Sequence, residues 1–209
     1  MLVKEAIEFG KVSKGNSKMP GTSYAIDAFA CKTGSKLAMV KGTPCNQCYA
    51  RKLQKLRPSV NKGWKANLHK WQVANVNNWI ASMVFQIERS GTAYHRWFDS
   101  GDLQGAIMLR AIIRVAIATP NVKHWLPTQE RDIVNKVLRR SKLPSNLIIR
   151  LSGSKVNGSA PSYAYTSTVF DKTGEPIGHE CPAPQQGGKC DQCRACWSKQ
   201  VKNVAYRKH

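Results

Sequence analysis

The sequence predicts an α/β fold built on a parallel sheet. Three short runs, at 94–98, 123–127 and 146–151, have the length of strands and are rich in aromatic and aliphatic residues. Segments with helical periodicity, at 103–118 and about 130–140, separate these runs, and the connections are short. Strands and helices that alternate in this way form right-handed crossovers, which place successive strands parallel in one sheet.

Residues 1–30 predict a basic, irregular N-terminal arm. Gly10 and Pro20 are among the residues that interrupt any apolar period there. Three lysines stand between these two breaks: Lys11, Lys14 and Lys18. The rest of the chain divides into an α/β core over 31–170, which includes three cysteines near its start, and a cysteine-rich segment over 171–209.

A long helix is expected over 64–88, where Val73, Val76 and Ile80 recur at three- and four-residue spacing. Basic and aromatic side chains stand in its first part: Lys65, Lys70 and Trp71. Such a mixture could stack nucleic-acid bases while the cations hold phosphates. The tryptophans could equally pack inward as ordinary helix residues, and the sequence leaves both interpretations open.

Caps and prolines mark the helix ends inside the α/β core. Asp102 is the expected N-cap of the helix over 103–118, and Pro120 ends that helix. The helix over about 130–140 closes before Pro144. These boundaries leave short loops, as crossover connections require.

Polar residues follow each predicted strand. The first strand leads into a polar cluster: Asp99, Ser100, Gly101 and Asp102. Thr128 and Glu130 follow the second strand, and Ser152 follows the third. Because the carboxyl ends of parallel strands share one edge, these residues predict a single ligand or cofactor pocket. Helix capping alone would account for Asp102 and Thr128 more readily than for Glu130.

Four cysteines near the C-terminus predict a metal centre. They are Cys181, Cys190, Cys193 and Cys196. Three cysteines spaced two residues apart with a remote Cys-Pro form the ferredoxin arrangement in a different order, which favours an iron–sulfur cluster, most simply a 4Fe–4S cluster. A zinc site is the alternative, although zinc more often uses two separate Cys-x-x-Cys turns. Disulfides are disfavoured because residues so close in a tight loop rarely meet disulfide geometry.

A second cysteine group stands near the start of the core, at Cys31, Cys45 and Cys48. Three thiolates could hold a cluster that leaves one iron open, as S-adenosylmethionine-binding clusters do. A distant ligand such as His95 or His124 could instead complete the site. These cysteines could also be structural thiols or join the C-terminal set, so the chain could carry one cluster or two.

Composition points to an anionic partner. The chain has 33 Lys and Arg against 12 Asp and Glu, a net charge of +21, and residues 1–70 hold 14 basic and 3 acidic side chains. Nucleic acid rewards such a density of cations through counterion release. A merely solubilising surface is the alternative.

The chain carries no apolar stretch of the roughly 20 residues that a membrane span needs, and its first residues lack a signal-peptide core. These features favour the cytosol, where thiols stay reduced. Seven cysteines in that compartment indicate metal or redox chemistry.

Four motifs occur together in one order: PCNQCYA at 44–50, RWFDSGDL at 96–103, WLPTQE at 125–130, and CPA at 181–183 with the cysteines that follow it. In this combination, over about residues 16–209, the chain resembles a family of phage proteins known as gene product 88-like. The resemblance implies a phage origin, a partial (β/α)-barrel-like sheet, iron–sulfur binding and similarity to radical S-adenosylmethionine proteins. It also implies a location in the cytoplasm of the bacterial host.

The triad departs from the usual signature of radical S-adenosylmethionine enzymes, because thirteen residues separate Cys31 from Cys45. Three functions therefore compete. The first is an iron–sulfur protein that binds nucleic acid, and the second is a radical-type enzyme that modifies RNA, DNA or a host factor. The third is a nucleic-acid-binding protein stabilised by zinc.

Overall fold

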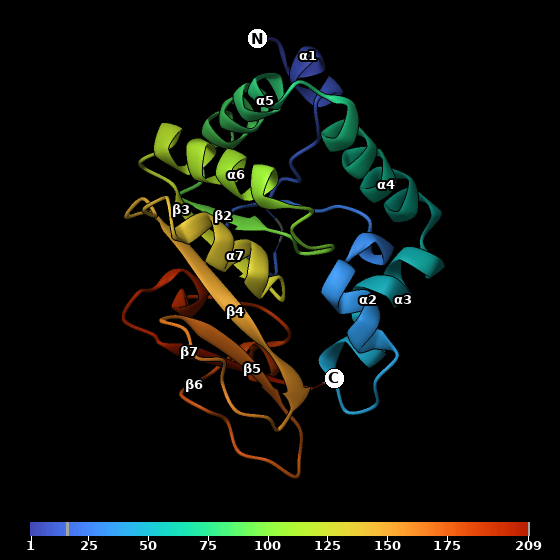
Figure 1. Cartoon of the computed structure of the whole chain (residues 1–209), viewed down its shortest axis with the longest axis vertical. Helices are drawn as coiled ribbons and strands as arrows, with labels where there is room; N and C mark the ends of the chain where they lie inside the picture. Colours follow the sequence, from blue (N-terminus) through green and yellow to red (C-terminus); the bar gives the residue numbers. More distant parts are fainter. Residues whose placement is uncertain (16, 209) are drawn as a thin grey trace.

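Seven strands form one open, parallel sheet within residues 1–15 and 17–208, which the computed structural model describes (Figure 1). Their order across the sheet is β1-β2-β3-β4-β5-β7-β6. The strands are β1 (Thr22–Tyr24), β2 (Tyr94–Trp97), β3 (Lys123–Thr128), β4 (Leu147–Val156), β5 (Thr166–Phe170), β6 (His179–Glu180) and β7 (Asn203–Arg207).

Neighbouring strands from β1 to β5 follow one another in the chain, as they do around a (β/α) barrel. The sheet does not close, because β7 lies between β5 and β6, and β6 forms an edge. The expected α/β class with a partial barrel-like parallel sheet is therefore confirmed. The predicted strands at 94–98, 123–127 and 146–151 correspond to β2, β3 and the first half of β4.

The helices are α1 (Val3–Glu8), α2 (Lys32–Ala38), α3 (Tyr49–Leu56), α4 (Pro58–Val73), α5 (Val76–Arg89), α6 (Ala106–Ala118) and α7 (Arg131–Leu138). Helices α5, α6 and α7 cover one face of β2–β4 (Figure 1). Helix α6 buries Met108, Leu109 and Ile112 there because these residues recur on one side of the helix. In the described chain, no helix combines the length and apolarity that crossing a bilayer requires.

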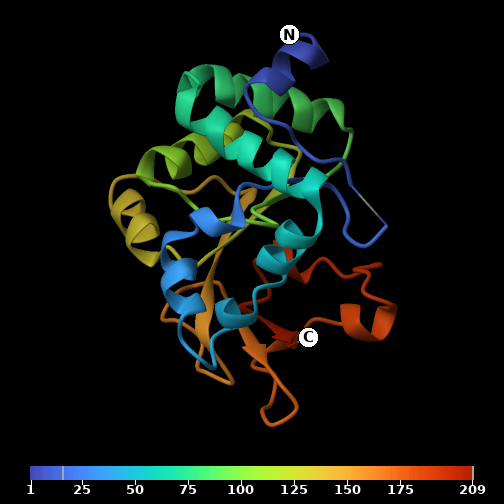
Figure 2. The ribbon, with the colours of Figure 1, turned by 90° about the vertical axis from the view of Figure 1, so that its right-hand side faces the viewer.

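The two faces of the sheet carry different layers. Side chains on the outer face, such as Leu126 and Ile149, join the main core under the helices. Their neighbours along the strands, Trp125 and Ile148, point to the inner face and pack with Trp197 from the C-terminal segment. Figure 2 shows that segment, in orange to red, on the other side of the sheet from α7.

Two expectations about the N-terminal half are wrong. Residues 1–30 are not wholly irregular, because they contain α1 and the edge strand β1. Strand β1 escapes a pattern-based search because it has only three residues and pairs with β2, far along the chain. The single helix expected over 64–88 is two helices, since α4 ends at Val73 and the Asn75 side chain caps α5 by accepting from the Asn77 N–H.

The cap assigned to α6 is also wrong. Gly105, not Asp102, occupies the N-cap position of that helix. The carboxylate of Asp102 instead accepts a hydrogen bond from Thr128 on the neighbouring strand-end loop. Strand β4 continues past the expected end at Ser152 to Val156, with a shift in its register against β5.

Two buried histidines stand side by side near the starts of β2 and β3. His95 contacts the Thr22 hydroxyl at 2.7 Å, and His124 contacts the Thr119 hydroxyl at 2.8 Å. Both rings also pack against Trp97 in the core. The structure therefore places these imidazoles in the core as threonine partners, and not as the distant ligand that could complete the N-terminal cysteine site.

Burial makes the histidine pair sensitive to acid. It lowers the pKa of His124 from 6.5 to about 4, and burial with the neighbouring His124 lowers the pKa of His95 well below its ordinary value. Because the unfolded chain binds these protons more readily, the stability from His124 is complete above about pH 6.5 and is lost as pH falls toward 4.

Replacing His124 by phenylalanine should flatten this acid dependence. Between pH 7 and pH 5 the native chain loses about 2 kcal/mol of unfolding free energy through this one group, and H124F should be spared that loss. Urea denaturation at the two pH values measures the difference. The control is H69F at the exposed His69, which should keep the native pH dependence; an equally steep fall in H124F would contradict the assignment.

Candidate metal centres

The four C-terminal cysteines line one small cavity, together with His179, Pro182 and Trp197. Cys181 follows β6, and its N–H donates to the Ala205 carbonyl on β7 at 2.8 Å. Cys190 and Cys193 share a tight turn, closed by the Cys193 N–H on the Cys190 carbonyl at 2.8 Å. The cysteines that were expected to act together are thus brought together in space.

Electrostatics in this cavity oppose four bare thiolates. Burial, with the nearby Cys181, raises the pKa of Cys196 to about 12. Burial also raises the pKa of Cys190, and the neighbouring Cys181 and Cys193 add to that rise. Ionising one thiol therefore disfavours ionising the next unless a cation lies between them.

Hydrogen-bonding groups surround the cysteine sulfurs. The Tyr206 hydroxyl lies 3.1 Å from Cys196 Sγ, and His179 Nε2 lies 3.6 Å from Cys193 Sγ. Tyr206 comes from β7 and His179 from β6, so regular strands fix both groups. Such outer partners orient ligands and tune the electronic properties of a metal centre.

Arg150 holds this segment onto the sheet. The side chain comes from β4 and is fully buried. All six of its hydrogen-bond acceptors are main-chain oxygens, those of Thr166, Ala195, Cys196, Ser198, Val201 and Lys202, at 2.8–3.3 Å. A guanidinium with five donors can satisfy this many carbonyls from one point, which no other side chain can do.

The N-terminal cysteines form a second group. Cys31 and Cys48 stand at the N-caps of α2 and α3, and Cys45 lies in the short turn Pro44–Gln47. The sulfurs of Cys31 and Cys45 flank Gly34, since a Cβ there would lie 3.7 Å from each of them and 3.0 Å from the Cys31 Cβ. Burial raises the pKa of Cys45 to about 11, with Cys48 and Asp102 contributing.

The strand-end residues meet beside this second group. Asp102 accepts from the Thr128 hydroxyl at 2.5 Å and from the Gln129 N–H at 2.9 Å. Gln129 reaches the next strand through the Gly153 carbonyl at 3.0 Å. Burial raises the pKa of Asp102 to about 7, although these hydrogen bonds lower it. One hydrogen-bonded network thus joins the loop after β2, the end of β3 and the second half of β4.

Two further contacts join the network to the N-terminal cysteines. Glu130 accepts from the N–H and hydroxyl of Thr33 in α2, at 2.8 and 2.9 Å. Tyr49, the residue after Cys48, donates its hydroxyl to the Asp99 carbonyl at 2.5 Å. Helices α2 and α3 accordingly lie on the side toward which β2 points (Figure 1). Active sites of barrel enzymes occupy this edge.

Ser100 and Gly101 contribute backbone contacts at this edge of the sheet. The Ser100 carbonyl accepts from the Ile26 N–H at 3.0 Å. Gly101 has φ +82°, and a Cβ there would stand 2.2 Å from the Ile26 side chain. Only glycine combines that backbone conformation with that close approach.

The lysines and tryptophan expected to bind nucleic acid fall into two groups, one with contacts inside the protein and one exposed to solvent. Lys70 Nζ donates to the Ile7 carbonyl at 2.5 Å, and Trp71 packs edge-on against Trp79 with ring centres 5.0 Å apart. Trp71 therefore packs inward, as the second interpretation held. The remaining members are exposed: Lys11, Lys14, Lys18 and Lys65.

The chain matches the model of the family described as gene product 88 over residues 4–199. The chain belongs to the gene product 88 family. This phage gene-product family match spans both cysteine groups, the strand-end network and Arg150. No curated protein and no solved structure matches the chain.

Several residues that surround the C-terminal cysteines of this gene product 88 protein were not expected from sequence. Arg150 is the single charged residue in the apolar run of β4, and that isolation is a signal that could have identified it. Tyr206 carries no such signal, because its contact with Cys196 depends on how β7 joins the sheet. His179 is likewise positioned only by the two-residue strand β6.

Removing the Arg150 guanidinium should destabilise the protein more than an ordinary substitution. R150M leaves buried carbonyls without donors and should lower the unfolding free energy by about 3 kcal/mol or more. R150K keeps a charge but offers three donors, so it should lie between R150M and the native chain. Urea denaturation measures the series, with R140M at the exposed Arg140 as the control. If R150M lowered the unfolding free energy by no more than about 0.5 kcal/mol, the size typical of surface sites, the role of Arg150 in holding this segment would be contradicted.

Proposed function

We propose that this gene product 88 protein is an iron–sulfur protein that acts on or binds nucleic acid. The observation that carries the proposal is the single cavity lined by Cys181, Cys190, Cys193 and Cys196. Four thiols in one hollow, on turns held by β6, β7 and Arg150, suit a fully ligated 4Fe–4S cluster. When bound, such a cluster supplies one-electron chemistry or a rigid cross-link.

The order of the ligands along the chain favours a cluster over zinc. Three cysteines spaced two residues apart with a remote Cys-Pro are typical of cluster-binding loops. Zinc more often uses two separate Cys-x-x-Cys turns. Among residues 1–15 and 17–208, no group of three or more His, Cys, Asp or Glu side chains is arranged to hold a metal ion. Zinc remains the alternative that metal analysis separates from iron.

The surrounding residues would support the cluster in distinct ways. The Tyr206 hydroxyl can donate to Cys196 Sγ, which would raise the reduction potential of a bound cluster. Trp197, 6% exposed, and Pro182 form apolar walls that limit water. Arg150 donates to the carbonyls of Ala195 and Cys196, so strand β4 holds the loop that carries Cys196.

Charge supports the nucleic-acid partner. The excess of 33 basic over 12 acidic side chains leaves a net charge of +21. Arg207 pairs with Glu180, and 12 acidic side chains are too few to neutralise 33 basic ones by internal pairing. Such a surface releases counterions when phosphates bind. Reduced cysteines of this kind fit the cytoplasm of the bacterial host.

A second candidate function rests on the N-terminal cysteines. Cys31, Cys45 and Cys48 lie beside Asp102 at the carboxyl ends of the strands, where barrel enzymes react. Three thiolates would leave one iron of a second cluster open for S-adenosylmethionine. In this candidate the protein is a radical-type enzyme, and Asp99, Thr128 and Glu130 help to shape the cofactor pocket.

Anaerobic purification should yield a brown protein with iron and sulfide in equal amounts, about four of each per cluster. C193S should lose the C-terminal cluster, and C45S should lose the N-terminal one if it is present. The control is Q192S, which changes the exposed neighbour of Cys193 and should keep the native iron content. Colourless protein with stoichiometric zinc, or C193S with native iron and sulfide content, would contradict the cluster proposal.

The enzyme candidate has its own test. Anaerobic protein reduced with dithionite should cleave S-adenosylmethionine to methionine and 5′-deoxyadenosine, and C45S should abolish this cleavage while Q192S retains it. Chromatographic product analysis measures both compounds. Intact S-adenosylmethionine with a fully loaded protein would remove this candidate and leave the first proposal standing.

A further inference from the structure

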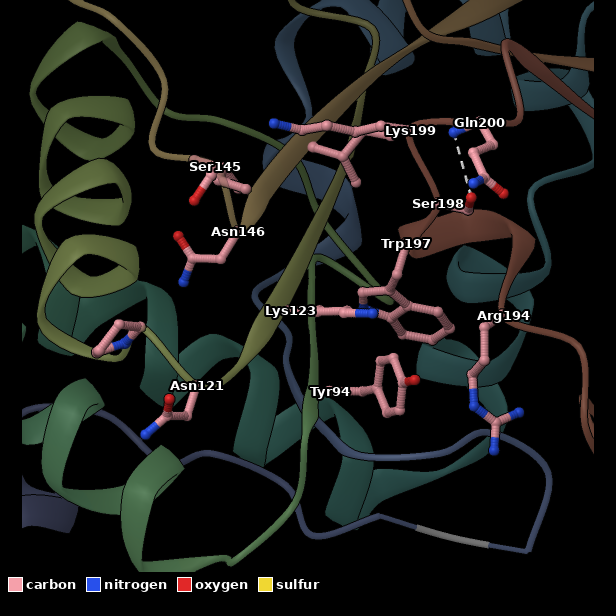
Figure 3. A pocket seen from close by; sticks show the side chains of 13 residues that line it. Tyr94, Asn121, Lys123, Ser145, Asn146, Arg194, Trp197, Ser198, Lys199 and Gln200 are labelled. Carbon is pink, nitrogen blue, oxygen red and sulfur yellow. Dashed lines mark hydrogen bonds between the residues drawn. The ribbon is translucent and has the colours of Figure 1, made fainter.

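A groove of about 560 Å³ opens at the amino-terminal ends of β2, β3 and β4, the edge opposite the strand-end network (Figure 3). Tyr94, Lys123 and Leu147 stand at the starts of the three strands. The other wall comes from the C-terminal segment, at Arg194 and 197–200. Neither cysteine group lines this groove, so it is a separate site.

The lining is cationic. Lys123, Arg194 and Lys199 contribute three positive charges, and none of the lining residues is Asp or Glu. Lys123 and Lys199 are exposed, and in the described chain neither forms an ion pair. No carboxylate in the lining competes with an anion for these cations. Arg194 also donates to the main-chain oxygens of Asp191 and Cys193, which hold its side chain in place.

An aromatic ring stands among these charges. Tyr94 is half-buried, with Arg194 Cζ 5.2 Å and Lys123 Nζ 6.0 Å from its ring centre. The Trp197 ring meets it edge-on at 5.3 Å. Cations held beside an aromatic ring are the combination with which proteins bind unpaired bases and their phosphates.

The walls are fixed before any ligand arrives. Asn146 donates to the carbonyls of Ala116, Thr119 and Val122 at 2.9–3.0 Å, which holds the start of β4 in place. Trp197 Nε1 donates to the His95 carbonyl at 3.0 Å and anchors the opposite wall to β2. A preformed groove loses little ordering entropy on binding.

We infer that this groove binds single-stranded nucleic acid, with one unstacked nucleotide in the hollow beside Tyr94 and the flanking phosphates on Lys123, Arg194 and Lys199. The inference rests on the proposed function, because it names where the proposed nucleic acid binds. A groove of about 560 Å³ has the size of a small-ligand site, which admits a splayed base but not a stacked base pair with both strands. Single-strand binders use this combination of stacking ring and cationic track.

The test uses anaerobically purified full-length protein and fluorescently labelled oligonucleotides of one sequence, as single strands of DNA and RNA and as a duplex. Fluorescence anisotropy over a salt series gives affinity and its salt slope. The native protein should prefer single strands. The double variant K123A/K199A should bind more weakly, and its salt slope should be shallower by about 0.7 for each lysine removed.

A substitution at Tyr94 separates the contribution of base stacking to affinity from the contribution of charge. Y94L should lower single-strand affinity roughly 5- to 150-fold, as loss of one stacked base predicts, with the salt slope unchanged. The matched control is K172A, which removes an equally exposed lysine outside the groove and should keep the native affinity within about twofold. Iron content, measured on each variant, confirms that the C-terminal segment is intact.

The outcomes distinguish the inference from the proposed function. The native protein could bind nucleic acid while K123A/K199A and Y94L bind as tightly as K172A. That result would overturn the assignment of the groove as the binding site and leave the nucleic-acid function standing. A native preference for duplex would overturn the single-strand assignment. Absence of binding to all three probes in low salt would overturn both the groove and the nucleic-acid partner, while the iron–sulfur proposal would still be judged by iron and sulfide.

Discussion

The packing of the C-terminal segment onto the sheet depends on one buried guanidinium. Arg150 emerges on the inner face of β4 and collects six main-chain oxygens from β5 and the C-terminal segment. Before β7 begins at Asn203, that segment has little regular structure, because β6 spans only two residues and the other elements are two short 3-10 helices. Without Arg150, its carbonyls would lie against an apolar sheet with no donors, at a cost that the small cluster of Trp125, Ile148 and Trp197 could hardly offset.

This clamp explains why one sheet can carry two different chemical environments. The outer face is an ordinary apolar core under α5, α6 and α7. The inner face also carries charged and thiol side chains, with the half-buried Arg96 over the Trp125 ring at 4.7 Å from its centre. Trp197 lines both the four-cysteine cavity and the cationic groove. If the four-cysteine cavity holds the proposed cluster, its binding would therefore stiffen one wall of the groove.

Prediction from sequence worked where local pattern and final environment agree. The runs that became β2, β3 and the first half of β4 are short, contain large apolar residues and alternate with helical segments, so their strand character and parallel direction could both be predicted. The polar strand ends also meet as expected, since parallel strands align their carboxyl ends. The failures involve distant partners. Asp102 bonds across to Thr128 instead of capping α6, and β1 exists only because β2 lies beside it.

The position of β7 has a consequence for biogenesis. The strand that separates β5 from β6 is later in the chain than both, and it supplies Ala205 to Cys181 and Tyr206 to Cys196. During synthesis all seven thiols leave the ribosome before residues 203–207 can enter the sheet. The nascent chain therefore passes through an interval in which the four C-terminal cysteines are present but not yet fixed by β7. If these cysteines bind the proposed cluster, that interval is when a cluster could be delivered to them and when their thiols are most open to oxidation.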